Sequence, residues 1–459
     1  MAHILNYLRS TKNIRRLSKL DWEKKYKNKE RSIEECASIV KSGMNIAAGP
    51  ASSFPLELIN AITGREEITK LNIFSGLLVT LPDFLNPDQK DKITFSPLFM
   101  GPVERAMLDM GILSPVSVHF SRMAEYFKRQ DIDVTVLEVS PPDKYGFMCI
   151  GTCAPMIGKS SLAHTKKIIV QINPNVPFIN GSDIYIHMDE IDMFCEVDRP
   201  LFELPDMPPD EDEVKIAKHI VPMIPDRATI QLGIGNLANA IGDFLSDKKD
   251  IGIHTEIITP SMINLYKKGV ITGKYKDIHK EKIMASFILA KKEDYEFVDN
   301  NPMVELHPTY YINDPYNIAK HKNLISINNA LNVDLTGQVA SESIGFKQFS
   351  GTGGQLDFVR GARMSEGGKS FMALKSTGKK GTASRIKLSL DPGTAVTTPR
   401  SDVQYVVTEY GIAKLDDKSL PERVVEMINI AHPKFREELA KKALSNQLIT
   451  QNMAANIKD

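Results

Sequence analysis

Two glycine-rich stretches and one glutamate are the residues best suited to chemistry. Residues 231–236 read Gln-Leu-Gly-Ile-Gly-Asn, and residues 350–355 read Ser-Gly-Thr-Gly-Gly-Gln. Between them, residues 251–256 form a short strand-like run that ends at Glu256. Glycine lets the backbone approach an anionic ligand closely, and the N-terminus of a helix offers that ligand unpaired N–H groups. The combination predicts a substrate that carries a nucleotide, with chemistry at the carboxylate.

Two hypotheses explain these residues. Residues 233–238 fit the G-x-G-x-x-A dinucleotide pattern, and Glu256 follows near the end of the next predicted strand, roughly 20 residues on, where such a fold places its ribose-binding acid. That spacing suggests a nicotinamide-dependent dehydrogenase. In the second hypothesis, Glu256 attacks an activated acyl group to form an anhydride, and N–H donors of loop 351–354 stabilise the oxyanion. The residues alone leave both open, together with a merely structural Glu256.

Neighbouring residues also admit two roles. His254 lies two residues before Glu256 and shares its face of the predicted strand, so it either orients the carboxylate or is a hydrogen-bonded structural histidine. The glycine turn at residues 351–354 is either a tight surface turn or a donor loop. The largely apolar residues 356–359 favour a donor loop, because they would hold the turn against a core.

Composition excludes several classes of protein. Lys and Arg total 57 and Asp and Glu total 57, which argues against a general nucleic-acid binder. No apolar run approaches the roughly 18 residues of a membrane span, so we expect a soluble globular protein. Four cysteines in 459 residues do not make a disulfide framework and fit a reducing compartment. Cys149 and Cys153 lack a second Cys/His pair at zinc spacing, so we expect buried thiols and no metal site.

Apolar strand-like runs alternate with amphipathic helices in both halves of the chain. This alternation predicts mainly parallel sheets covered by helices. Residues 205–213 are rich in proline and acid and are the predicted linker. The expected architecture is two tandem open α/β domains, residues 1–204 and 214–459. The predicted strands are 44–48, 71–74, 134–139, 167–172, 228–232, 250–254, 285–289, 324–327, 370–374 and 403–407.

The first 20 residues carry five basic side chains and no acid before Asp21. This composition is typical of a basic surface helix, which we favour, and also of an organellar transit peptide. We therefore expect a cytoplasmic protein, with a mitochondrial-type organelle as the alternative.

Several motifs in order give the chain a family resemblance. They are Ile251–Glu256, Asp334–Gln338, Ser341–Gly345, Gly351–Phe358, Val406–Ala413 and Ala431–Pro433. Together they resemble the acetyl-CoA hydrolase/transferase family, closest to its butyryl-CoA:acetate and 4-hydroxybutyrate CoA-transferase branch. The resemblance runs from about Asp21 to the end of the second domain.

The resemblance implies an active site in the cleft between the two α/β domains. Glu256 falls on the family's nucleophile, which forms a glutamyl-CoA thioester in a ping-pong transfer between acyl-CoA and a short-chain carboxylate such as acetate. No metal, ATP or other cofactor is implied, and the expected assembly is a homodimer without nucleic-acid or membrane partners. A thioester hydrolase on the same scaffold is the nearest alternative, and a non-catalytic CoA-binding protein is a further one.

The resemblance also assigns residues that contact coenzyme A. Lys379 would reach the phosphates, a role that Lys380 could take after a one-residue shift. The assigned positions are Gln231, Gly233, Ile234, Gly235, Asn236, Leu331, Gly354 and Lys379. Residues 49–53 and 415–419 depart from the family pattern, so substrate preference does not transfer with the resemblance.

Overall fold

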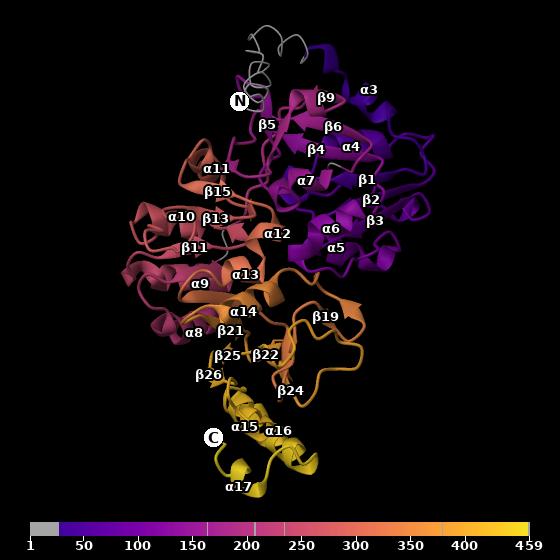
Figure 1. Cartoon of the computed structure of the whole chain (residues 1–459). Helices are drawn as coiled ribbons and strands as arrows, with labels where there is room; N and C mark the ends of the chain where they lie inside the picture. Colours follow the sequence, from indigo (N-terminus) through magenta and orange to yellow (C-terminus); the bar gives the residue numbers. More distant parts are fainter. Residues whose placement is uncertain (1–26, 163, 206–207, 234, 379, 458–459) are drawn as a thin grey trace, which may run out of the picture.

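The computed structural model describes residues 27–457, except residues 163, 206–207, 234 and 379. The expectations for residues 1–20, Ile234 and Lys379 therefore fall outside the described residues. The rest of the chain folds around two mostly parallel sheets flanked by helices, which confirms the predicted fold class (Figure 1). None of the described helices combines the length and the apolar character that a membrane crossing requires.

The first sheet has the strand order β3-β2-β1-β4-β6-β9, and all its neighbouring strands are parallel. From β1 the chain adds β2 and β3 on one side, and then returns to add β4, β6 and β9 on the other. The strands are β1 Asn45–Ala48, β2 Leu71–Ser75, β3 Ile93–Pro97, β4 Val134–Val139, β6 Lys167–Ile172 and β9 Met193–Glu196. The helices of this half are α3 Ile33–Ser38, α4 Leu56–Thr63, α5 Pro102–Met107, α6 Met123–Lys128 and α7 Lys159–Leu162.

The second sheet has the strand order β26-β25-β21-β16-β10-β11-β13-β15-β7. Its neighbours are parallel except for the antiparallel pair β25–β26 at one edge. The strands are β7 Asn180–Gly181, β10 Thr229–Leu232, β11 Gly252–His254, β13 Ile283–Ala285, β15 Val304–Leu306, β16 Leu324–Asn329, β21 Lys369–Ala373, β25 Tyr405–Thr408 and β26 Gly411–Lys414. Its helices are α8 Glu211–Ile220, α9 Asn236–Phe244, α10 Pro260–Lys267, α11 Lys292–Val298, α12 Thr309–Ile312, α13 Pro315–Ile318 and α14 Gln355–Met364.

Short strand pairs and three C-terminal helices complete the described fold. The helices α15 Leu420–Asn429, α16 Pro433–Ser445 and α17 Gln451–Ala454 lie together at one end of the molecule (Figure 1). The short strands are β5 Phe147–Cys149, β8 Tyr185–His187, β12 Ile257–Ile258, β14 Phe287–Ile288, β17 Asn332–Asp334, β18 Val339–Ala340, β19 Ser343–Ile344, β20 Lys347–Gln348, β22 Thr377–Gly378, β23 Ala383–Ser384 and β24 Ile386–Lys387.

The acidic end of the predicted linker is helical. Helix α8 begins at Glu211, so residues 211–213 belong to a helix rather than to the linker. The Asp210 side chain accepts the backbone N–H groups of residues 212 and 213, and Glu213 accepts that of residue 210 in return. Acidic side chains in a first turn are also favoured by the helix dipole. The run of acids that suggested a linker is therefore a helix start.

The two halves share structure. Strand β7 comes from the first half but pairs with β15 at the edge of the second sheet. One buried apolar cluster also contains residues from both halves, among them Val139 and Ile172 with Ile230 and Ile253. Because packed interiors deform little, this common core fixes the two sheets relative to each other.

Candidate active site

The carboxyl ends of three neighbouring strands place the first glycine loop beside Glu256. Strand β10 lies between β16 and β11 in parallel register. The chain passes from β10 outward through β11, and β16 later joins on the opposite side, so the strand order reverses between β10 and β16. In open α/β sheets, ligands bind outside the carboxyl ends of the strands at such a reversal. The loop after β10 and Glu256 after β11 both lie at this edge.

Gly233 and Gly235, in the loop after β10, present backbone and no side chain. Gly233 donates its N–H to the Ile327 carbonyl at 3.1 Å, and a Cβ at Gly233 would meet nothing closer than that oxygen at 3.7 Å. Gly235, the N-cap residue of α9, has a φ of 127°, a conformation that favours glycine. Asn236, the first residue of α9, is partly exposed. The loop therefore leaves space and a helix N-terminus for an anionic group.

Gln231 has a different role from the other predicted contact residues. Its side chain is 1% exposed and accepts a hydrogen bond from the Ser326 hydroxyl at 2.7 Å. It also donates to the Asn328 side chain at 3.2 Å. These bonds join β10 to β16 beneath the glycine loop, so the side chain of Gln231 supports the loop and is not itself open to a ligand.

The Glu256 carboxylate is held by one amide donor. The backbone carbonyl of Glu256 accepts N–H groups from Ser286 and Phe287, at 2.9 and 3.0 Å. Its side chain accepts a hydrogen bond from Asn313, which follows α12, with Nδ2 2.5 Å from Oε1. Burial raises the pKa of Glu256 to about 7, the Asn313 bond lowers it, and the Asp357 charge raises it. The carboxylate is therefore poorly solvated and close to half ionised at neutral pH, which makes it a reactive base and nucleophile.

The second glycine loop packs directly on this carboxylate. A Cβ on Gly354 would overlap both Glu256 Oε1 and Asn313 Nδ2, so any other residue would displace these two groups from their present positions. On its other side the loop meets the first half of the chain, because a Cβ on Gly351 would overlap the Leu98 carbonyl. The Gly353 carbonyl accepts the N–H of residue 120 at 3.0 Å. The loop thus lies between Glu256 and segments that follow strand β3.

His254 braces the donor to Glu256 rather than the carboxylate itself. Its Nε2 lies 2.8 Å from the Ile312 carbonyl, and its Nδ1 lies 2.9 Å from Nε2 of His321. Burial lowers the pKa of His254 to about 3 and that of His321 to about 2, so both rings are neutral. A neutral His254 donates to the Ile312 carbonyl and accepts from His321. Because residue 312 directly precedes Asn313, this bonded pair fixes the segment that holds Glu256.

The remaining predicted contact residues lie further along the same edge. Leu331 follows β16, is partly exposed, and donates its N–H to the Ala340 carbonyl at 2.9 Å. Lys380 is exposed in the turn between β22 and β23 with a φ of 55°. The structure therefore brings Glu256 and Gly354 into contact, and it places the β10 loop and Leu331 after the carboxyl ends of the neighbouring strands β10 and β16. Sequence reasoning missed Asn313 and His321, which no local motif marks.

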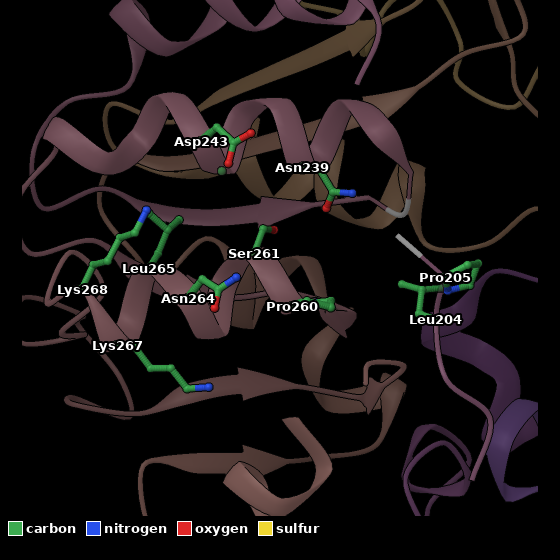
Figure 2. A pocket seen from close by; sticks show the side chains of 11 residues that line it. Leu204, Pro205, Asn239, Asp243, Pro260, Ser261, Asn264, Leu265, Lys267 and Lys268 are labelled. Carbon is green, nitrogen blue, oxygen red and sulfur yellow. The ribbon is translucent and has the colours of Figure 1, made fainter. Parts of the chain in front are cut away.

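A separate groove of about 410 Å³ lies between α9 and α10 (Figure 2). Leu204 and Pro205 from the end of the first half complete its wall, and Lys267 and Lys268 extend from α10. Its lining includes neither Glu256 nor Asn313 nor Gly354. This groove is therefore distinct from the site around the carboxylate.

The predicted buried thiols are confirmed. Cys149 and Cys153 are buried and free, and burial raises the pKa of each to about 11. Protonated thiols of this kind are poor nucleophiles. They leave Glu256 as the stronger candidate for covalent chemistry.

Comparisons with known proteins agree with this geometry. The acetyl-CoA hydrolase/transferase N-terminal domain matches residues 13–205, and the C-terminal domain of the same family matches residues 291–443. The 4-hydroxybutyrate coenzyme A transferase of Clostridium kluyveri is 40% identical over 92% of this chain and 98% of that protein. The butyryl-CoA:acetate CoA-transferase of Anaerostipes caccae is 36% identical over 94% and 99%.

A solved structure has the same fold. RipA from Yersinia pestis superposes with a TM-score of 0.87 at 33% identity, covering 94% of this chain and 100% of that one. Neither relative named above is a dehydrogenase. The chain belongs to the acetyl-CoA hydrolase/transferase family, within its group of CoA-transferases.

Proposed function

We propose that this protein moves coenzyme A between a short-chain acyl-CoA, butyryl- or 4-hydroxybutyryl-like, and a carboxylate such as acetate, with Glu256 as covalent nucleophile. The observation that carries the proposal is the packing of the Glu256 carboxylate against Asn313 and Gly354, beside a glycine loop at the reversal of strand order. The names of the relatives supply the substrate classes.

The transfer proceeds by exchange at two carbonyl carbons. One oxygen of Glu256 attacks the acyl-CoA carbonyl, the C–S bond breaks, and an acyl-glutamyl anhydride and CoA thiolate form. The thiolate then attacks the glutamyl carbonyl and expels the first carboxylate, which leaves a glutamyl-CoA thioester. An incoming carboxylate attacks that thioester to give a new anhydride and free thiolate. Attack of the thiolate on the new acyl carbonyl releases the second acyl-CoA and restores Glu256. The thioester bond energy is conserved, so the chemistry requires no ATP and no metal or other cofactor.

Asn313 and Gly354 have defined roles in this sequence. The Asn313 amide holds Oε1 at 2.5 Å, which directs the other carboxylate oxygen to the acyl carbon. When the glutamyl carbon becomes tetrahedral, negative charge develops on the oxygen next to Asn313, so the same amide stabilises the oxyanion. The absence of a side chain at Gly354 leaves room for this oxygen.

Coenzyme A supplies binding energy away from the reacting carbon. The backbone at Gly233 and Gly235 and the N-terminus of α9 are suited to its anionic and polar groups. We place Leu331 beside the same ligand and Lys379 at its phosphates, following the family resemblance. Contacts to these remote groups can offset the cost of bringing the acyl carbon against a poorly solvated carboxylate.

Hydrolysis is the second candidate, because water that reached the glutamyl-CoA thioester would release free coenzyme A. The Glu256 side chain is partly exposed before substrate binds, so water has access in this state. The two activities separate on one measurement. A transferase turns over acyl-CoA repeatedly only when an acceptor carboxylate is present, whereas a hydrolase needs none.

The covalent step is tested by intact mass. The protein is mixed with butyryl-CoA and then with borohydride, which reduces a glutamyl thioester to an alcohol. We expect a lower mass at Glu256 and loss of activity in the wild type, and neither mass change nor initial activity in Glu256→Gln. Glu66→Gln, at an exposed position, is the matched control and should behave like the wild type. An unchanged wild-type mass with several acyl-CoAs would remove the covalent mechanism. Light scattering of the same samples tests the expected homodimer.

A further inference from the structure

Three potential metal ligands converge outside the candidate active site. They are His279, which precedes β13, Glu305 in β15 and His307 just after β15. Their nearest donor atoms all lie within 4.8 Å of one another. Glu305 Oε2 lies 2.9 Å from Nδ1 of His279 and 3.1 Å from Nε2 of His307. One carboxylate oxygen thus faces two imidazole nitrogens.

The outer nitrogen of each ring meets a hydroxyl group. Nε2 of His279 lies 2.9 Å from the Tyr311 hydroxyl, and Nδ1 of His307 lies 2.7 Å from the Ser182 hydroxyl. A hydroxyl can both donate and accept a hydrogen bond. Each ring can therefore carry its proton on the inner nitrogen, facing Glu305, or on the outer one, with the inner lone pair free. The second arrangement is the one in which histidine binds a metal and its outer N–H is held by a partner.

The backbone holds one of these ligands in an uncommon conformation. His279 has a φ of 47°, in the left-handed region that few residues other than glycine adopt. Such conformations persist where the surrounding structure determines them, and they gather at functional sites. The rings are also ordered by contact, because those of His307 and Tyr311 lie 5.3 Å apart at an interplanar angle of 36°.

We propose that His279, Glu305 and His307 bind one divalent first-row transition ion, with Zn²⁺ as the best fit. Two imidazoles and a carboxylate form a donor set that such ions accept. Zinc-ligand distances of about 2.0–2.2 Å place tetrahedral ligand atoms roughly 3.3 Å apart. The two separations of 2.9 and 3.1 Å need only small outward shifts to reach that value, and the nitrogens of the two rings lie within 4.8 Å of each other. The side chains of His279 and Glu305 are 27% and 20% exposed, so water can supply the fourth ligand.

Two lysines oppose the binding of a cation. Lys282 Nζ lies 3.8 Å from Oε1 of Glu305, the oxygen turned away from the histidines. Lys276 is buried, and burial lowers its pKa to about 7, so its charge is largely lost above neutral pH. Removing the charge of Lys282 should therefore tighten metal binding. A lysine-to-methionine change keeps most of the apolar stem.

The position of the cluster gives the ion a bracing role. Ser182 follows β7, the strand that the first half contributes to the second sheet. Tyr311 lies in α12, two residues before Asn313. An ion at this cluster would join the two halves of the chain and hold α12 in place. The cysteine spacings could not predict this cluster, because it contains no cysteine and its residues come together only in the folded sheet.

The test is direct metal binding by the full chain after treatment with a chelator. We expect one Zn²⁺ per chain by calorimetry and elemental analysis, with micromolar or tighter affinity, and a rise in the melting temperature. Co²⁺ should give a visible spectrum without a sulfur-to-metal band. A sulfur band, or no stoichiometric binding of Zn²⁺, would overturn the proposal.

Variants assign the binding to these residues. Glu305→Gln and His307→Gln should abolish stoichiometric binding, while His164→Gln, at an exposed histidine outside the cluster, should leave it unchanged. Tyr311→Phe keeps the ring, so we expect it to fold, and it should weaken binding roughly 10–100-fold. Lys282→Met should strengthen binding. Unchanged affinity in Tyr311→Phe together with Glu305→Gln would show that Zn²⁺ binds elsewhere and would overturn the assignment.

Discussion

Replacing Glu256 by glutamine should make the protein more stable at alkaline pH, because the native carboxylate is ionised at a cost. Its pKa is raised from 4.5 to about 7, so the folded state binds a proton more tightly than the unfolded state does. The sign follows from proton linkage: this group favours folding below pH 4.5, and the advantage is lost as the pH rises through about 7. Glutamine has the shape of the acid without its charge, and its Oε1 can still accept a hydrogen bond from the Asn313 amide.

The magnitude follows from the two pKa values. A difference of about 2.5 pH units corresponds to about 3 kcal/mol above pH 8, and to about 1 kcal/mol at pH 5, where the unfolded carboxylate is already partly ionised. Because the side chain is partly exposed, solvent screening lowers these values and they are upper bounds. The stability gain of Glu256→Gln should therefore grow severalfold between pH 5 and pH 8.

The assay is denaturant unfolding followed by far-ultraviolet circular dichroism at pH 5 and pH 8. Slopes and midpoints must be compared together, since a chain with two sheets need not unfold in one step. Glu66→Gln, which replaces an exposed carboxylate, is the control and should show no pH-dependent gain. The reasoning would be refuted by equal stability of wild type and Glu256→Gln at pH 8, or by a stability gain that does not shrink at pH 5. Either result would show that ionising Glu256 in the folded protein does not carry the stated free-energy cost.

Three further predictions concern the same site. The backbone of Gly354, with a φ of −108°, is allowed for alanine, so we expect Gly354→Ala to fold. Its Cβ would overlap Glu256 Oε1, so kcat should fall about 100-fold or more. Near-wild-type turnover would contradict the close packing of Gly354 on the carboxylate. Asn313→Ala removes a hydrogen-bond donor that lowers the Glu256 pKa, so the acidic limb of the pH–rate profile should move above about 7. We also expect kcat to fall roughly 10–100-fold. An acidic limb that stays in place would show that Asn313 does not act on the carboxylate. His254 and His321 have pKa values of about 3 and about 2 when folded and 6.5 when unfolded, so the stability that the neutral pair contributes is present above pH 6.5 and is lost as the pH falls below it. A variant with both replaced by leucine should lose less stability between pH 6.5 and pH 4, and an equal acid slope would count against a neutral pair.

Local patterns predicted most strands of the two main sheets, but not β3, β7, β9, β15 or β26, and they singled out Glu256 as a nucleophile candidate. The runs at residues 134–139 and 167–172 became β4 and β6 with the predicted bounds, because buried parallel strands are mostly apolar segments. The predicted strand at 285–289 instead divides into β13 and β14. Ser286, between them, donates its N–H to the Glu256 carbonyl. The hydrogen bond between Ser286 and Glu256 thus lies at a break in a strand that the sequence shows as continuous.

Contacts across the fold could not be predicted from spacing. Asn313 is 57 residues from Glu256, and His321 is 67 residues from His254. Asn313 and His321 both lie in the connection between β15 and β16. This connection crosses the sheet because β16 joins the opposite side of β10 from β11, which no local pattern specifies. His254 shows the same limit. Its place on the strand suggested either of two roles, and only the packing of α12 and His321 shows that it is a bonded structural histidine.

The cost of burying Glu256 has a consequence for catalysis. None of the described groups that shift its pKa is a cation, and the nearby charge of Asp357 disfavours ionisation further. The ionised carboxylate is therefore destabilised by up to about 3 kcal/mol at pH 8, whereas an anhydride or thioester at the same position carries no charge. Forming either covalent state removes this cost, which favours it by up to about 300-fold relative to a solvated carboxylate. A lysine or arginine beside Glu256 would stabilise the free enzyme more than the intermediates and would slow the transfer. Activation by packing rather than by charge thus explains why the site surrounds its nucleophile with an amide and a glycine.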